Sequence, residues 1–106
     1  MIDAHSESDL DTALKTISDR QQRLICLLLR ESEPRPVSDF LPRSVQASRT
    51  AETDFYHNHL PRLAELEYID WDREAGEVSQ GDRFGEIEPL LDILDTHAEE
   101  LPGTWP

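Results

Sequence analysis

Apolar residues in this chain recur mostly at spacings of three and four, the period of an amphipathic helix. The first such pattern covers residues 10–28 and predicts helical structure in the N-terminal third. Ser18 and Gln21 have the spacing of a capping box, so the main helix is expected to begin at Ser18, after a short separate helix. Two prolines within residues 31–36 then end the pattern, because proline has no backbone donor.

Two further helices are expected in the middle of the chain. Ser38 can cap a short second helix, in which Pro42 removes a donor near the first turn. The third helix follows Ser48 or Thr50, either of which can act as its cap. Pro61 lies inside its apolar pattern and should bend it, because an interior proline costs on the order of 3 kcal/mol.

The pattern after the third helix changes to alternation, which is typical of a half-buried strand. Ile69 and Trp71 alternate with acids, and a second alternating stretch begins near Val78. Gly76 lies between the two and can adopt the positive φ that a hairpin turn needs. Helical spacing returns over residues 86–101. We therefore predict a mainly α fold with a small β-hairpin wing, that is, a winged helix-turn-helix plus a C-terminal amphipathic helix.

The length of 106 residues suits a single domain. We expect four parts. They are a flexible N-terminus (residues 1–8), the winged helix-turn-helix domain (9–80), a C-terminal helix that is a candidate for dimerisation (81–101) and a tail (102–106).

The charge is strongly acidic, with 23 acids, 10 bases and a formal net charge of −13. Nine of the bases are arginine, and this balance is similar to that of cytoplasmic proteins from halophiles that accumulate salt. Dense surface carboxylates hold water and cations when molar salt screens their repulsion. Residues 20–50 carry +3 and residues 51–106 carry −12. The positive stretch is either a docking place for an anionic partner or an ordinary solvated face.

Several classes of function lack support in the sequence. No apolar run approaches the ~20 residues that cross a bilayer, and no signal-type leader opens the chain, so we expect a cytoplasmic protein without a membrane partner. The single Cys26 permits no internal disulfide. No catalytic or phosphate-binding motif is present, and we expect neither an enzyme nor a cofactor. No residue cluster identifies a small-molecule ligand.

Two histidines in the third helix could suggest a metal. His57 and His59 are two residues apart and therefore point about 200° apart on a helix, which makes them a poor metal pair. We expect no metal site, and His59 is expected to be a hydrogen-bonded core residue.

Four stretches resemble a known family. They are Leu14-Lys15-Thr16-Ile17-Ser18-Asp19-Arg20, Val37-Ser38, His57-Asn58-His59-Leu60-Pro61-Arg62-Leu63 and Tyr68-Ile69-Asp70-Trp71-Asp72. They are similar to the haloarchaeal winged-helix domains of uncharacterised function, which are related to ArsR-like regulators. The resemblance covers residues 10–80 and implies a winged-helix fold, DNA binding and dimerisation through terminal helices. One departure is Glu67, which stands where such domains commonly have a glycine between helix and wing.

A third helix in the major groove would read bases with its N-terminal half. The base-reading candidates are Ser48, Arg49, Thr50, Thr53, His57 and Asn58. The phosphate-contact candidates are Arg43, Arg62 and Arg73. The dimer candidates are Leu27, Ile87, Leu91 and Leu94. For the base-reading positions, a polar solvent-exposed face is the alternative interpretation, and Glu52 and Asp54 would repel phosphates.

These observations predict a DNA-binding transcriptional regulator of a halophilic archaeon, a homodimer whose partner is double-stranded DNA. The alternative is a winged-helix protein-protein interaction module that does not bind DNA, which the −12 of residues 51–106 favours. The two hypotheses differ in geometry. A DNA binder should place Arg49, Arg62 and Arg73 on one surface without carboxylates.

Overall fold

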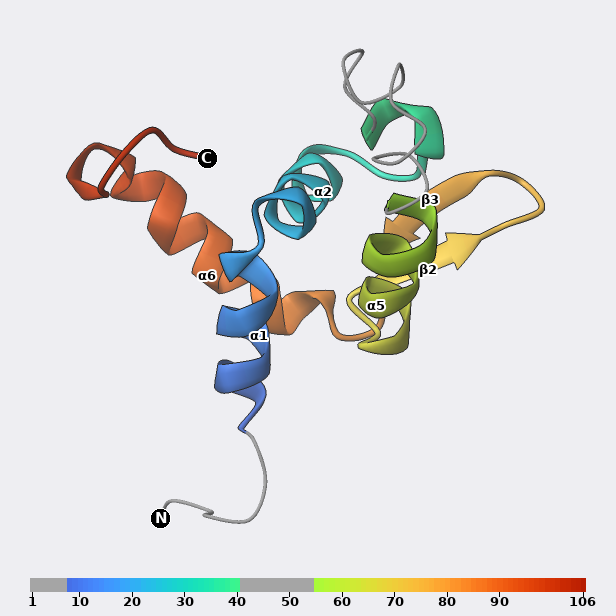
Figure 1. Ribbon diagram of the computed structural model, residues 1–106, viewed down its shortest axis with the longest axis horizontal. Helices are drawn as coiled ribbons and strands as arrows, with labels where there is room; N and C mark the ends of the chain where they lie inside the picture. The colour runs from blue at the N-terminus through green and yellow to red at the C-terminus, as the bar shows by residue number, and fades with distance from the viewer. Residues whose placement is uncertain (1–7, 41–54) are drawn as a thin grey trace.

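A computed structural model of the chain describes residues 8–40 and 55–106 (Figure 1). Its α-helices are α1 (Asp9–Ser18), α2 (Arg20–Glu31), α5 (Leu60–Glu65) and α6 (Phe84–Thr96). Shorter helical turns are η1 (Val37–Phe40), the π-helical η2 (Phe55–His59) and η3 (Ala98–Glu100). The strands are β1 (Arg35–Pro36), β2 (Ile69–Asp72) and β3 (Glu77–Gln80), which form one antiparallel sheet in the order β1-β3-β2. The predicted mainly α fold with a hairpin wing is confirmed.

The first helical pattern divides into α1 and α2, as expected, but the cap differs. Asp19 has an extended backbone, and its carboxylate accepts the backbone N–H of Gln22 at 3.1 Å. The Ser18 hydroxyl donates instead to the carbonyl of Lys15 at 2.6 Å. Asp19 therefore caps α2, since an aspartate side chain competes well for the free N–H groups of a first turn.

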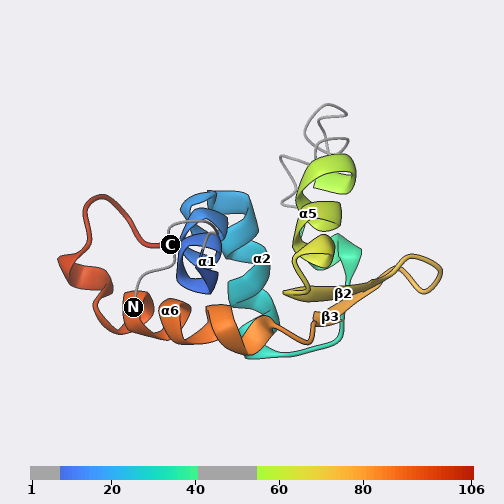
Figure 2. The same cartoon turned by 90° about the horizontal axis from the view of Figure 1, so that it is seen from below.

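Helix α6 lies across α1 and α2, while α5 and the hairpin form the other half of the molecule (Figure 2). Side chains from both halves meet in one core. The largest fully buried ones are Thr16, Ile25, Cys26, Leu29, Leu60, Leu63, Tyr68, Val78, Ile87 and Leu91. Burial raises the pKa of the Cys26 thiol to about 12, so this cysteine is a protonated packing residue.

The location of the dimer candidates follows from this packing. Ile87 and Leu91 are 0 % exposed and belong to the core of their own chain. They therefore cannot contact a second copy of the protein while this fold is kept. Leu27 and Leu94 are half-buried against the same core. Within residues 8–40 and 57–106, the exposed large apolar side chains are Leu10, Leu14 and Ile93.

Pro61 lies at a change of helix type. The segment before it is the π-helical η2, and α5 begins at Leu60, so that Pro61 occupies its first turn. A proline ring clashes with the carbonyl four residues earlier and offers no N–H. The regular α-helical hydrogen bonds are replaced by a π-helical turn just before Pro61. The chain thus accommodates the proline with a wider helical turn where the sequence predicted a bend.

The junction from α5 to β2 is a Schellman cap, with Glu67 in the position usually taken by glycine. Glu67 has a φ of 66°, in the left-handed region. Its N–H donates to the Ala64 carbonyl at 3.0 Å, and the Tyr68 N–H donates to the Leu63 carbonyl at 3.1 Å. The fold therefore requires a left-handed backbone at position 67, where the resembled family commonly has glycine. Glu67 adopts this conformation with some backbone strain.

Gly81 closes this junction from the other side. A Cβ atom at Gly81 would lie 2.4 Å from the Glu67 carbonyl oxygen, closer than such contacts permit. The Gly81 N–H donates to the Tyr68 carbonyl at 3.0 Å, and the Arg83 N–H donates to the Glu67 carbonyl at 2.9 Å. The end of the hairpin and the start of α6 are thereby fixed to the end of α5.

The tail after η3 folds back onto α2. The Trp105 indole N–H donates to Asp95 at 3.0 Å, and the Arg23 guanidinium lies 5.5 Å from the centre of the Trp105 ring. Arg20 Nε donates to the carbonyl of Pro106 at 3.3 Å. The tail is thus part of the folded domain, held by one charged hydrogen bond and two arginine contacts.

Gly81→Ala should lower the free energy of unfolding by about 1–3 kcal/mol, because the added methyl meets a fixed backbone carbonyl. Gly85→Ala is the matched control. Nothing lies within 4 Å of a Cβ there, and alanine in α6 should be neutral or stabilise by up to about 1 kcal/mol. Urea unfolding followed by circular dichroism measures both. Equal effects of the two variants would contradict the close approach.

Acid should release the tail. The hydrogen bond from Trp105, and then that from Arg30, lower the pKa of Asp95 below its ordinary value. A depressed carboxyl pKa means that the stabilisation is present above the ordinary value and is lost as pH falls through the folded-state value. In a Trp71→Phe variant, Trp105 is the one remaining tryptophan, and its emission should shift over that acidic range.

Asp95→Ala should produce the same emission shift at neutral pH. Asp92→Ala, which removes a 2.8 Å contact to Arg30, should leave the emission unchanged. A neutral-pH spectrum of Asp95→Ala identical to that of the parent would show that Asp95 does not hold the tail.

Candidate nucleic-acid interface

The segment formed by η2 and α5 carries three of the described candidates for DNA contact. Leu60 and Leu63 are 0 % exposed and turn the inner face of α5 toward the core. This packing leaves Arg62 exposed on the outer face. His57 and Asn58 are also exposed, at the end of η2. The structure therefore presents three of the predicted polar side chains outward from one continuous segment.

His59 differs from His57 in its surroundings. It is half-buried, with Nδ1 3.4 Å from the Gln22 amide nitrogen and 3.9 Å from an Asp19 carboxylate oxygen. This contact ties η2 to the first turn of α2. His59 is therefore hydrogen-bonded, as expected, but it is half-buried and does not belong to the buried core. Among the residues that the structure describes, no group of three or more histidine, cysteine or acidic side chains could hold a metal ion.

The wing is a tight hairpin with an arginine at its tip. The Asp72 carboxylate accepts the Ala75 N–H at 3.1 Å, and Gly76 takes the predicted positive φ, at 67°. The guanidinium of Arg73 lies 4.2 Å from the centre of the Trp71 ring. This stacking limits the motion of an exposed arginine and fixes it beside the turn.

Carboxylates surround both exposed arginines of the interface. Residues 57–80 contain Arg62 and Arg73 against six acids, a net charge of −4. All six acids are exposed: Glu65, Glu67, Asp70, Asp72, Glu74 and Glu77. The surface around Arg73 is therefore not free of carboxylates, which would repel a phosphate group unless salt screens them.

The described candidates lie at two places. The segment from η2 to α5 runs down to the sheet, whereas the tip of the wing projects away from it (Figure 2). The structure thus separates Arg73 from His57 and Asn58. This separation is compatible with a DNA-binding protein whose helix and wing contact different parts of the duplex. The remaining candidates, Arg43, Ser48, Arg49, Thr50 and Thr53, lie outside the described residues, as does most of the predicted second helix.

Two features of the structure had only partial signals in the sequence. The left-handed Glu67 could be suspected from its place between helix and strand, but its non-glycine identity hid the requirement. A cavity beside α2 is lined by Leu24, Leu27 and Leu28, which belong to a run of residues, 24–29, that is apolar around most of the helix. The tail that forms one wall of this cavity had no pattern of its own.

The arrangement of elements is compatible with the winged-helix class, in which a helical segment is followed directly by a two-stranded wing. A family model described as a domain of unknown function (DUF7344) matches residues 30–79, from the end of α2 into β3. No curated protein and no solved structure gave a match. Within the described residues, no helix is both long enough and apolar enough to span a bilayer.

Proposed function

We propose that the protein is a DNA-binding regulator of transcription, with the segment that ends in α5 in the major groove and the wing along the backbone. The observation that carries this proposal is the rigid junction at Glu67, which joins an outward-facing polar helix directly to a wing with an arginine at its turn. A sequence-specific DNA-binding protein needs this combination, because the residues that contact bases and those that contact phosphates must keep a fixed separation.

The proposal includes a working environment of molar salt, in a halophilic archaeon. The chain has a net charge of −13, and residues 57–80 alone carry −4, which would repel DNA in dilute buffer. At about 1 M salt the screening length is roughly 3 Å. Screening then weakens the repulsion between phosphates and more distant carboxylates more than it weakens a direct contact between arginine and phosphate. The net charge therefore no longer decides whether the protein binds DNA.

The protein should be folded in molar potassium chloride and lose helical circular dichroism as salt falls toward ~0.1 M. The screening length then grows to about 10 Å, and the surface carboxylates repel one another across the domain. Unchanged helix content and unchanged thermal stability at low salt would remove the halophilic part of the proposal.

Selection of bound genomic fragments at molar salt should enrich a two-fold repeat with half-sites about one helical turn apart, as two symmetric copies require. Asn58→Ala should relax preference at one base position, because a base contact discriminates. Arg73→Ala should weaken binding on every sequence.

Two charge variants serve as controls for the wing. Arg73→Lys keeps the cation and should retain most of the binding, whereas Glu74→Gln removes a neighbouring carboxylate and should strengthen binding on all sequences. Parallel losses from Asn58→Ala and Arg73→Ala on every sequence would show that the assigned roles are wrong.

A second candidate function is a protein-interaction module, and the six exposed carboxylates of residues 57–80 favour it. A cationic partner protein would meet this surface without the repulsion that DNA meets. Absence of any enriched sequence, together with saturable binding of a basic protein at the wing, would favour this function over DNA binding.

Dimerisation belongs to the proposal too. The exposed apolar residues that could form an interface are Leu10 and Leu14 on α1 and Ile93 on α6, at 56 %, 45 % and 57 % exposure. An exposed apolar patch on a small domain is a common site of self-association.

A further inference from the structure

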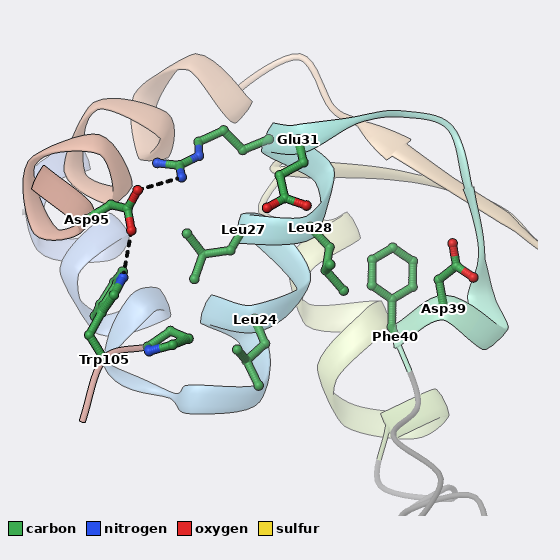
Figure 3. A pocket seen from close by; sticks show the side chains of 10 residues that line it. Leu24, Leu27, Leu28, Glu31, Asp39, Phe40, Asp95 and Trp105 are labelled. Atoms are coloured by element: carbon green, nitrogen blue, oxygen red, sulfur yellow. Dashed lines mark hydrogen bonds and ion pairs between the residues drawn. The ribbon is translucent and has the colours of Figure 1, made fainter. Parts of the chain in front are cut away.

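A cavity of about 450 Å³ lies beside α2, on the side away from the core. Its floor is a row of three leucines, Leu24, Leu27 and Leu28 (Figure 3). Phe40 of η1 stands at one end of this row, and Trp105 of the tail stands at the other (Figure 3). The site is therefore built from α2, from η1 shortly after it, and from the distant C-terminal part of the chain.

The leucine floor exists because α2 is apolar around most of its circumference. Ile25, Cys26 and Leu29 are at most 2 % exposed and fill the core. The three floor leucines point the other way and are only half-buried. An apolar row that the chain covers incompletely, within a concave and pre-formed surface, has the character of a small-molecule site.

The charged side chains at the edge are already paired. Arg30 lies 3.1 Å from Asp95, and Arg35 lies 3.6 Å from Glu31 and 3.5 Å from Asp39. Each carboxylate that lines the cavity thus contacts a guanidinium group, so an ammonium ligand gains little. Among the residues that line the cavity, an anionic ligand would meet three carboxylates and one arginine, Arg30, which disfavours it.

Trp105 offers its ring to the cavity rather than a hydrogen bond. Its N–H is already donated to Asp95 at 3.0 Å (Figure 3). Arg23 lies 5.5 Å from the ring centre, which holds the indole in place. The lining therefore supplies aromatic faces and aliphatic contacts, with its polar groups already committed to partners within the chain.

We propose that this cavity binds a small, uncharged, largely apolar molecule that contacts the leucines of α2 between Phe40 and Trp105. The volume is within the roughly 300–1,000 Å³ of ordinary ligand sites. The binding site does not depend on the proposed DNA function. The sequence predicts Leu27 as a dimer residue. In this proposal Leu27 contacts the ligand instead.

The test uses two probes that share a ring system and differ in charge. N-phenylnaphthylamine is neutral, and anilinonaphthalenesulfonate carries one negative charge. The neutral probe should bind the full chain saturably in molar salt, and the sulfonate should bind at least about tenfold more weakly. In the Trp71→Phe variant, the bound neutral probe should quench Trp105 by energy transfer, which gives a second readout of binding.

Leu27→Gln should weaken binding of the neutral probe by about tenfold or more, because it places an amide on the apolar floor. Ile93→Gln is the matched control, since Ile93 is 57 % exposed on α6 and does not line the cavity. Its affinity for the probe should equal that of the parent. Leu24→Gln gives a second floor variant should Leu27→Gln fold poorly.

A measurement on the unaltered protein keeps the test independent of variants. Saturating neutral probe should raise the unfolding temperature, because a ligand that binds only the folded state stabilises it. Absence of saturable binding, or equal losses from Leu27→Gln and Ile93→Gln, would overturn the proposal. So would sedimentation as a dimer that Leu27→Gln dissociates, because a second copy would then occupy the cavity.

Discussion

The backbone contact between Glu67 and Gly81 is the constraint on which the rest of the structure depends. Four elements meet within a few residues of it: the end of α5, the start of β2, the end of β3 and the start of α6. The Glu67 carbonyl can accept the Arg83 N–H only because Gly81 has no side chain between them. The direction of the wing relative to α5, and the direction of α6 relative to both, follow from this one contact.

Periodicity predicted the elements but not the details of their ends. The alternation around Ile69 and Val78 and the helical spacing before Pro34 lead to the observed fold, because each reflects burial on one face. The cap of α2 is Asp19 rather than Ser18. Both residue types cap well, so the spacing alone does not choose between them, and the Ser18 hydroxyl bonds the Lys15 carbonyl instead. Likewise, apolar spacing marks Ile87 and Leu91 as buried without telling whether their own chain or a partner covers them.

The candidate interface was predictable in its chemistry and only partly in its geometry. Exposure of His57, Asn58 and Arg62 follows from the opposite face of α5 carrying Leu60 and Leu63. The stacking of Arg73 on Trp71 joins a residue of the turn to a residue of β2 two positions earlier, and sequence spacing alone does not show it. The cavity beside α2 needed the tail to return over 86 residues of chain, from Pro106 to Arg20, a contact that no local pattern encodes.

The acidic wing has a consequence for self-association as well as for DNA. The strand order places β2 at an edge of the sheet, where an unpaired backbone can recruit a strand from another molecule. Along β2, Ile69 is buried and Trp71 half-buried, while Asp70 and Asp72 face solvent. Two copies that met edge to edge would align these carboxylates against each other. The charges that oppose a polyanion therefore also oppose the pairing of this edge with the same edge of a second copy.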